Sequence, residues 1–268
     1  MEPGLARDTL TLLLGFTTGV LSALFGIGGA IVSNPGLRAL GAAPLVAVGT
    51  TLPSILPGAI SGTLRYRREG LVNWQLIIPA AASGLLAVVA GSFLSHAVPG
   101  GGHLLLLLIA VLLAFTAWRT AAVPPATPAP DAAEDVAAAA PEGRTRWLAA
   151  GIGVVAGLLS GLLGIGGGVI MVPAFTELLG LSLKSAIATS LVCVGIFGVP
   201  ATITHAFLGD IDWRLAVLLT IGVIPGARIG ASLTIRTAER RLRLAVGIFL
   251  ALVALVYFVT ETRALLAL

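Results

Sequence analysis

Charged side chains are scarce in this chain. Asp, Glu, Lys and Arg make up 10% of its 268 residues, whereas hydrophobic residues make up 57%. Soluble globular domains carry about 25% charged residues. Together with a mean hydropathy of +1.04, this shortage excludes a soluble enzyme and predicts an integral membrane protein.

Cysteine and recognisable catalytic motifs are also nearly missing. Cys193 is the single cysteine, so no internal disulfide can form, and its apolar surroundings predict a small packing residue. We find no Ser/His/Asp arrangement, no HExxH motif and no Cys/His cluster. We therefore expect no enzyme activity, no cofactor and no metal.

The basic residues are distributed as topology signals. The net charge is +4 and the pI is about 10.2, but Lys and Arg cluster at the ends of apolar segments, which is typical of membrane topology and argues against nucleic-acid binding. Arg7 before an apolar run is reminiscent of a signal peptide. No A-x-A-like site follows, so we expect the N-terminus to be retained.

Eight apolar stretches follow one another along the chain, and most approach the roughly 20 residues that cross a bilayer core as a helix. They predict an all-α, multi-pass protein of the cell inner (plasma) membrane. The stretches are Leu10–Val32, Leu45–Leu64, Leu71–Leu94, Leu104–Trp118, Trp147–Val172, Ser185–Leu208, Leu215–Ile235 and Leu242–Val259.

The chain contains an internal repeat. GVLSALFGIGGAIVSNP at Gly19–Pro35 returns as GLLSGLLGIGGGVIMVP at Gly157–Pro173, and further on Trp74 matches Trp213. We expect two transmembrane repeats, residues 1–120 and 146–268, joined by a Pro- and Ala-rich extended linker at 121–145. Each glycine cluster is followed by a proline, which predicts a helix interrupted in its middle.

Loop charges distinguish two topologies. If all segments cross fully, nine Lys and Arg residues lie on the side of the termini and six on the other. If each glycine segment instead enters and returns on one side, four lie with the termini (Arg7, Arg38, Arg214 and Arg263). Eleven then lie opposite, and Arg228 is left out as intramembrane. The eleven are Arg65, Arg67, Arg68, Arg119, Arg144, Arg146, Lys184, Arg236, Arg240, Arg241 and Arg243.

The second count fits the positive-inside rule better. It favours two inverted repeats, each a re-entrant hairpin plus three spans, with both termini outside and the linker inside. Kinked full spans remain the alternative.

The glycine clusters are candidate anion sites. A helix broken at membrane depth exposes backbone N–H groups, and the N-terminus of the next half-helix carries a partial positive charge. The two breaks of an inverted pair are expected to approach each other. The alternative is that the glycines only allow close helix packing. The candidate glycines are Gly26, Gly28, Gly29, Gly164, Gly166, Gly167 and Gly168.

Hydroxyl and amide groups follow each break. Thr50 and Thr51 match Thr189 and Ser190, and hydroxyls can donate hydrogen bonds to an oxyanion; alternatively they cap a helix or bond to its own carbonyls. Ser33 and Asn34 add polarity only in the first copy, where the second has Met171 and Val172. The two half-sites are therefore not equivalent.

Arg228 is the one basic residue well inside an apolar segment. It is a candidate counter-charge for an anion, with snorkelling toward the interface as the alternative.

Trp74 and Trp213 are expected to be interfacial anchors, and His205 to be solvated. Glu177 is the best candidate for a coupling carboxylate, although a solvated position at the end of a hairpin is the simpler interpretation.

The two motifs LFGIGGAIVSNP and LLGIGGGVIMVP, each leading to a T-T/S pair and a G-x-x-x-W loop, resemble the sulfite exporter TauE/SafE family over nearly the whole chain. The resemblance implies a bacterial-type inner-membrane transporter of sulfur-containing anions such as sulfite, thiosulfate, sulfoacetate or other organosulfonates. It places the substrate at the candidate glycines. Two departures, Ala30 where the second copy has Gly168 and Asn34 beside Pro35, leave open a substrate shifted toward the second half.

We expect a secondary transporter, most simply an exporter, whose partners are a small sulfur-containing anion and the lipid bilayer. A passive anion channel and a non-transporting component of a larger complex are the rival interpretations. Whether the protein is a homodimer is left open by the sequence.

Overall fold

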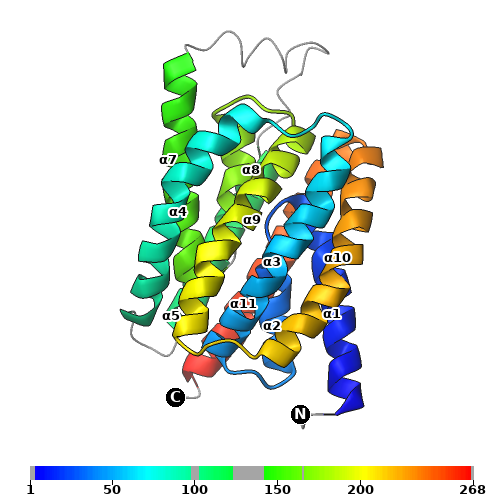
Figure 1. Cartoon of the computed structure of the whole chain (residues 1–268), viewed down its shortest axis with the longest axis vertical. Coiled ribbons are helices and arrows are strands. Elements are labelled where there is room, and N and C mark those ends of the chain that lie inside the picture. The colour runs from blue at the N-terminus through cyan, green and yellow to red at the C-terminus, as the bar shows by residue number, and fades with distance from the viewer. Residues whose placement is uncertain (1–3, 98–102, 123–141, 165, 267–268) are drawn as a thin grey trace.

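The structure is a computed structural model that describes residues 4–97, 103–122, 142–164 and 166–266. Within these ranges it is all-helical (Figure 1), and seven helices are long and apolar enough to cross a membrane. Most of the predicted linker lies outside the described residues. The helices are α1 (Leu5–Phe25), α2 (Ala30–Ala39), α3 (Pro44–Arg67), α4 (Trp74–Ala97), α5 (His103–Ala122), α7 (Glu142–Leu163), α8 (Gly168–Glu177), α9 (Leu183–Phe207), α10 (Trp213–Arg236) and α11 (Glu239–Leu266).

Both glycine segments break their helices, as predicted. Helix α1 ends at Gly26, which has a left-handed φ of 68°, and α2 begins four residues later. Gly164 (φ 65°) directly follows α7 in the same way, and Gly167 (φ 67°) directly precedes α8. Left-handed backbone is readily adopted by glycine and costs other residues energy. Within the described residues, each glycine segment therefore forms two helices in place of one.

The broken helices fold back as hairpins. A side chain built on Gly36 of α2 would meet Leu14 of α1, and one on Gly29 would meet Thr18. Residues on both sides of the break are therefore neighbours, which a merely kinked helix would not allow. Gly167 similarly lies against Ala156 of α7.

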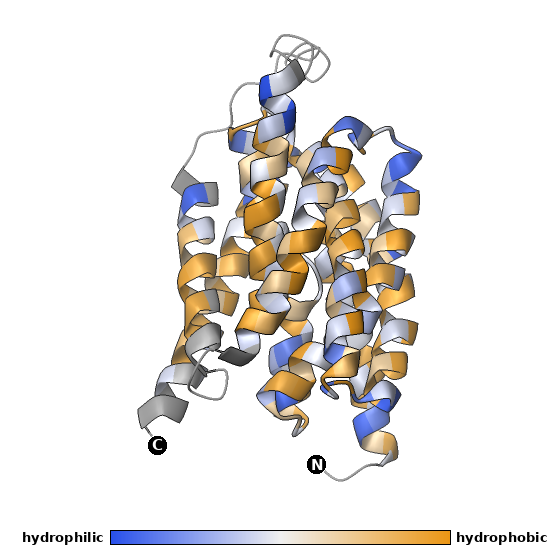
Figure 2. Cartoon of the chain, turned by 60° about the vertical axis from the view of Figure 1, so that its left-hand side comes forward, coloured by the Kyte–Doolittle hydropathy of each residue, from blue (hydrophilic) through white to orange (hydrophobic). Residues whose placement is uncertain are grey.

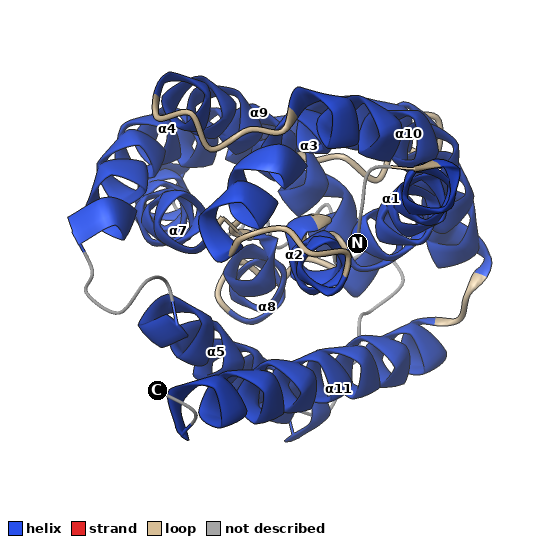
Figure 3. Ribbon diagram, turned by 90° about the horizontal axis from the view of Figure 1, so that it is seen from below, coloured by secondary structure: helices blue, strands red, loops and turns tan. Residues whose placement is uncertain are grey.

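Helices from the two halves pack in matched pairs. Helix α1 packs on α10 and its counterpart α7 on α4, while α3 contacts α10 and α9 contacts α4. Viewed from one end (Figure 3), α2 and α8 lie near the middle, and α5 with α11 forms a layer along one face. The two halves thus interlock rather than forming separate bodies.

Small residues permit this close packing. Gly222, Gly226 and Gly230 of α10 face the α1 backbone at Leu12, Phe16 and Val20, with no room for a Cβ. Gly153, Gly157 and Gly161 of α7 face α4 in the same way. Close backbone approach supplies the van der Waals contact that holds helices together in a membrane.

The polar residues gather at the two ends of the bundle, and the middle is apolar (Figure 2). Helix α1 begins and α11 ends at the same end, and α1 and α7 run in opposite directions (Figure 1). Ion pairs join separate elements at these ends: Asp8 with Arg214, and Arg119 with Glu177. Trp74 and Trp213 begin α4 and α10 and are half-exposed, as expected of interfacial anchors.

Candidate anion site at the two glycine breaks

The two glycine breaks meet in the interior. A Cβ on Gly166 would lie 3.4 Å from the Cα of Gly28, and one on Gly168 would overlap the carbonyl oxygen of Gly26 and lie 2.7 Å from the Cα of Ile27. These residues are all buried. The expected approach of the two breaks is therefore present in the structure.

Each break also rests on a helix from the other half. A Cβ on Gly26 would lie 2.7 Å from the carbonyl oxygen of Ile187 on α9, and Gly164 packs against Val48, the counterpart of Ile187, on α3. Ser190 donates a 2.8 Å hydrogen bond to the carbonyl oxygen of Gly26. This predicted site hydroxyl therefore fixes the first break in place.

Unpaired backbone donors lie at the break between α1 and α2. Among the described residues, the N–H groups of Gly28, Gly29, Ala30 and Ile31 have no hydrogen-bond partner. They precede or begin α2, where the helix dipole adds a partial positive charge. In the other half the N–H of Gly166 and that of Gly167 are likewise unpaired within the described chain, at the start of α8. Two positive helix ends thus converge on one buried place.

Asn34 adds a side-chain donor in the next turn of α2. It is 1% exposed, and its Oδ1 accepts a 3.0 Å hydrogen bond from Thr51. Its Nδ2 is buried and has no partner among the described residues. The hydroxyl of neighbouring Ser33 donates to the carbonyl of Gly29 at 3.1 Å instead. Asn34 therefore has free donor capacity, whereas Ser33 mainly supports the break.

Thr18 is a polar residue of this region that the sequence reasoning missed. It is 1% exposed, its hydroxyl has no partner among the described residues, and its methyl group faces Gly29. Thr18 corresponds to Ala156 in the second copy. Thr18 directly precedes the repeated stretch, and this polar-for-apolar difference was the available signal.

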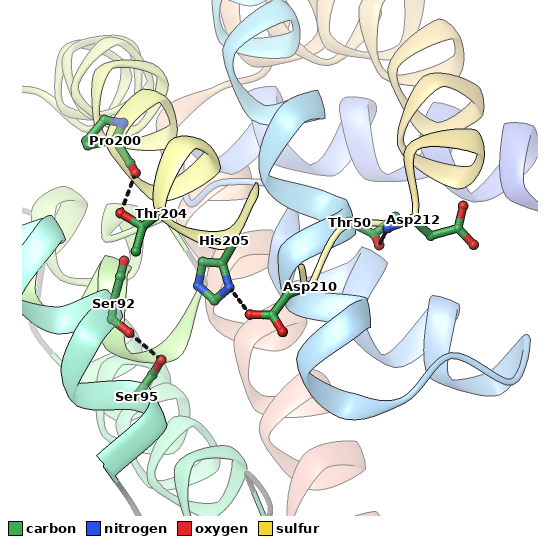
Figure 4. Close-up of polar contacts among 8 residues, drawn as sticks. All are labelled: Thr50, Ser92, Ser95, Pro200, Thr204, His205, Asp210 and Asp212. Carbon is green, nitrogen blue, oxygen red and sulfur yellow. Dashed lines mark hydrogen bonds and ion pairs between the residues drawn. The ribbon is translucent and has the colours of Figure 1, made fainter. Parts of the chain in front are cut away.

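Thr50 and Thr189 serve the contact between the halves. The hydroxyl of Thr50 accepts a 2.9 Å hydrogen bond from the N–H of Asp212 (Figure 4), and that of Thr189 accepts a 3.1 Å bond from the N–H of Asn73. Asp212 and Asn73 each cap the start of a helix, α10 and α4 respectively. Each of these two hydroxyls therefore binds the start of a helix in the opposite half.

Arg228 lies on the outer surface of the bundle. It is exposed and lines a small hollow with Ser61, Leu64, Arg65 and Arg68 at the C-terminal end of α3. The snorkelling alternative expects such a position. Arg228 is therefore not among the buried residues around the two breaks.

Two further titratable residues have partners that the sequence did not reveal. Glu177 is paired with Arg119, which leaves it an ion-pair partner at the end of α8. His205 is 1% exposed, and its Nδ1 lies 2.8 Å from Asp210 (Figure 4), so the expectation that it is solvated is wrong. In the described part of the chain no group of three His, Cys, Asp or Glu could hold a metal.

Comparison with known protein families gives one match over most of the chain. The family described as sulfite exporter TauE/SafE matches residues 11–257, which include both glycine breaks and most of the helices around them. The chain belongs to the sulfite exporter TauE/SafE family. It is consequently a multi-pass membrane protein of a transporter family.

Relatives carry the same general description. A probable membrane transporter protein of Xylella fastidiosa is 29% identical over 84% of this chain and 82% of its own length. The probable membrane transporter protein YunE of Bacillus subtilis is 28% identical over 91% of this chain and 94% of its own length. No solved structure matches.

Proposed function

We propose that this TauE/SafE protein is a secondary transporter, most simply an exporter, of small sulfur-containing anions such as sulfite, thiosulfate or organosulfonates. One observation carries the proposal: the N-terminal ends of α2 and α8 meet at two buried glycine breaks whose N–H groups are unpaired within the described chain. Helix N-termini of this kind bind anions. The family's description as a sulfite exporter supports the chemical class.

The hydrogen-bond donors at the two breaks suit an anion that is bound and then released. Backbone N–H groups, the Asn34 amide and the Thr18 hydroxyl offer hydrogen bonds without a fixed positive charge. A buried Lys or Arg would hold an oxyanion more tightly. A site built from dipoles is therefore consistent with transport rather than permanent binding.

Membrane potential favours the outward direction. An inside-negative potential of 100 mV is worth about 2.3 kcal/mol per elementary charge and drives anions out of the cell. Export consequently needs no ATP-binding module. Uptake would need a coupled cation, and Glu177, the carboxylate considered for that task, is paired with Arg119.

The proposed mechanism is alternating access between two inverted repeats. Its support is the matched packing of α1 on α10 and α7 on α4, the opposite directions of α1 and α7, and the larger share of basic residues at one end. The glycine breaks are buried in the present conformation. Transport in this scheme requires the two halves to separate at one end and then at the other.

Purified protein in proteoliposomes tests the proposal. We expect saturable flux of radiolabelled sulfite, thiosulfate or sulfoacetate, with acceleration by the same anion on the opposite side. Single-channel currents would instead identify a passive anion channel. Absence of flux for the whole panel would leave a non-transporting component of a complex, and would refute the proposal.

A further inference from the structure

We propose that the outer surface of α3 and α10 holds the phosphate of one anionic phospholipid, bound by Arg228 together with Arg65 and Arg68. These residues and Ser61 line a hollow of about 110 Å³. Arg228 also lines a second hollow of about 490 Å³, which runs past Ile229 and Leu233 to Arg236. One arginine thus joins two neighbouring hollows on the lipid-facing surface.

The positive charge of this surface is only partly compensated by acidic side chains. Arg65 pairs with Glu69 in the next turn. Within the described residues, neither Arg68, Arg228 nor Arg236 has an acidic partner. Three arginines line one hollow, and guanidinium groups bind phosphate through paired hydrogen bonds.

The depth of Arg228 favours a lipid over a dissolved anion. Arg228 lies eight residues before Arg236, the last residue of α10, which corresponds to about 12 Å of helix at 1.5 Å per residue. An arginine at this depth is costly unless it is paired or reaches the interface. Arg228 shares the hollow with Arg65 and Arg68 at the end of α3, and a headgroup phosphate held there supplies its partner.

Apolar residues beside the arginines provide a path for acyl chains. Leu64, Ile229 and Leu233 are 56%, 46% and 45% exposed, and Pro225 and Ile229 line the larger hollow. The arginines lie at the end of the bundle that carries most of the basic loops. Basic pockets between helices on that side are suited to anionic headgroups. The occupant that fits is therefore a phospholipid such as phosphatidylglycerol.

Native mass spectrometry of the full chain in detergent tests this inference, with titration by phosphatidylglycerol and by phosphatidylcholine. We expect tighter binding of phosphatidylglycerol by the wild type, and about a fivefold loss of that affinity in Arg228→Gln and in Arg68→Gln. Arg67→Gln is the matched control, because Arg67 is an exposed neighbour that lines neither hollow. It should retain wild-type affinity.

Three results would overturn the inference. In the first, the wild type binds phosphatidylglycerol no more tightly than phosphatidylcholine. In the second, Arg228→Gln and Arg68→Gln both keep the wild-type affinity for phosphatidylglycerol. In the third, Arg67→Gln loses as much of that affinity as they do. A final measurement adds excess inorganic phosphate to the phospholipid-bound protein. If it displaces the phospholipid from the wild type and itself binds in an Arg228-dependent way, the ligand is a dissolved anion and not a lipid.

Discussion

At the scale of single residues, the carboxamide of Asn34 is used at one end only. Thr51 donates to its oxygen and thereby orients the side chain, while the nitrogen stays without a partner in the described chain. A buried amide donor without a partner costs stability. A bound oxyanion would supply that partner.

We expect Asn34→Leu to raise the KM for the transported anion by at least about tenfold, because a hydrogen bond to a charged group contributes about 1.5–3 kcal/mol. Ser33→Ala is the control, since the Ser33 hydroxyl is already bonded to Gly29 within its own helix turn. Flux against substrate concentration in proteoliposomes measures both. Equal KM values in wild type and Asn34→Leu would remove Asn34 from the site.

Single-residue positions show where the sequence was informative and where it was not. The sequence identified Arg228 as unusual. Whether its side chain faces the interior or the lipid depends on which face of α10 packs against α1. Gly222, Gly226 and Gly230 mark the face of α10 that packs on α1, and Arg228 lies about 200° around the helix from Gly226, at 100° per residue. The outward position could therefore have been inferred. The partners of Thr50 and Thr189 could not, because they belong to the other half.

At the scale of elements, the two hairpins are similar but not identical. Gly168 leaves room for the carbonyl of Gly26 and the backbone of Ile27, whereas its counterpart in the first copy is Ala30. The break positions followed from glycine and proline in the sequence. The difference between the copies became understandable only when their mutual contact was known.

The threonine contacts between elements predict a stability effect separate from transport. Thr50→Val and Thr189→Val each leave the N–H of a helix-capping residue without its acceptor. Combined, they should lower the melting temperature in detergent by about 2–6 °C and leave the KM unchanged. Thr17→Val is the control, because Thr17 is exposed and bonds only to carbonyls of its own helix. A raised KM without a change in melting temperature would contradict this assignment.

At the scale of the whole molecule, the repeat predicted the organisation into two halves, and the eight apolar stretches predicted the class. The interlocking of the halves was beyond sequence reasoning. It depends on which glycine faces which carbonyl, as with Gly226 and Phe16, and such pairings arise only when distant segments come together.

The proposed inversion predicts that residues matched by the repeat lie on opposite sides of the membrane. Arg67 and Ala206 are such a pair, and both are exposed at helix ends. We expect an impermeant maleimide to label Arg67→Cys and Ala206→Cys from opposite sides. Cys193 is fully buried and should stay unlabelled in the parent protein. Labelling of both variants from one side would show that the halves are parallel.

The central claim, that the anion passes through the place where the two glycine breaks meet, is tested most directly by comparing counter-exchange flux in Gly168→Ala and Gly151→Ala. Both substitutions add one methyl group to a helical glycine of the second half. A Cβ on Gly168 collides with the backbone of Gly26 and Ile27, whereas Gly151 has open space around it. At equal amounts of folded protein, we predict that Gly168→Ala loses at least about nine-tenths of the flux and that Gly151→Ala keeps it. Wild-type flux in Gly168→Ala would contradict the claim.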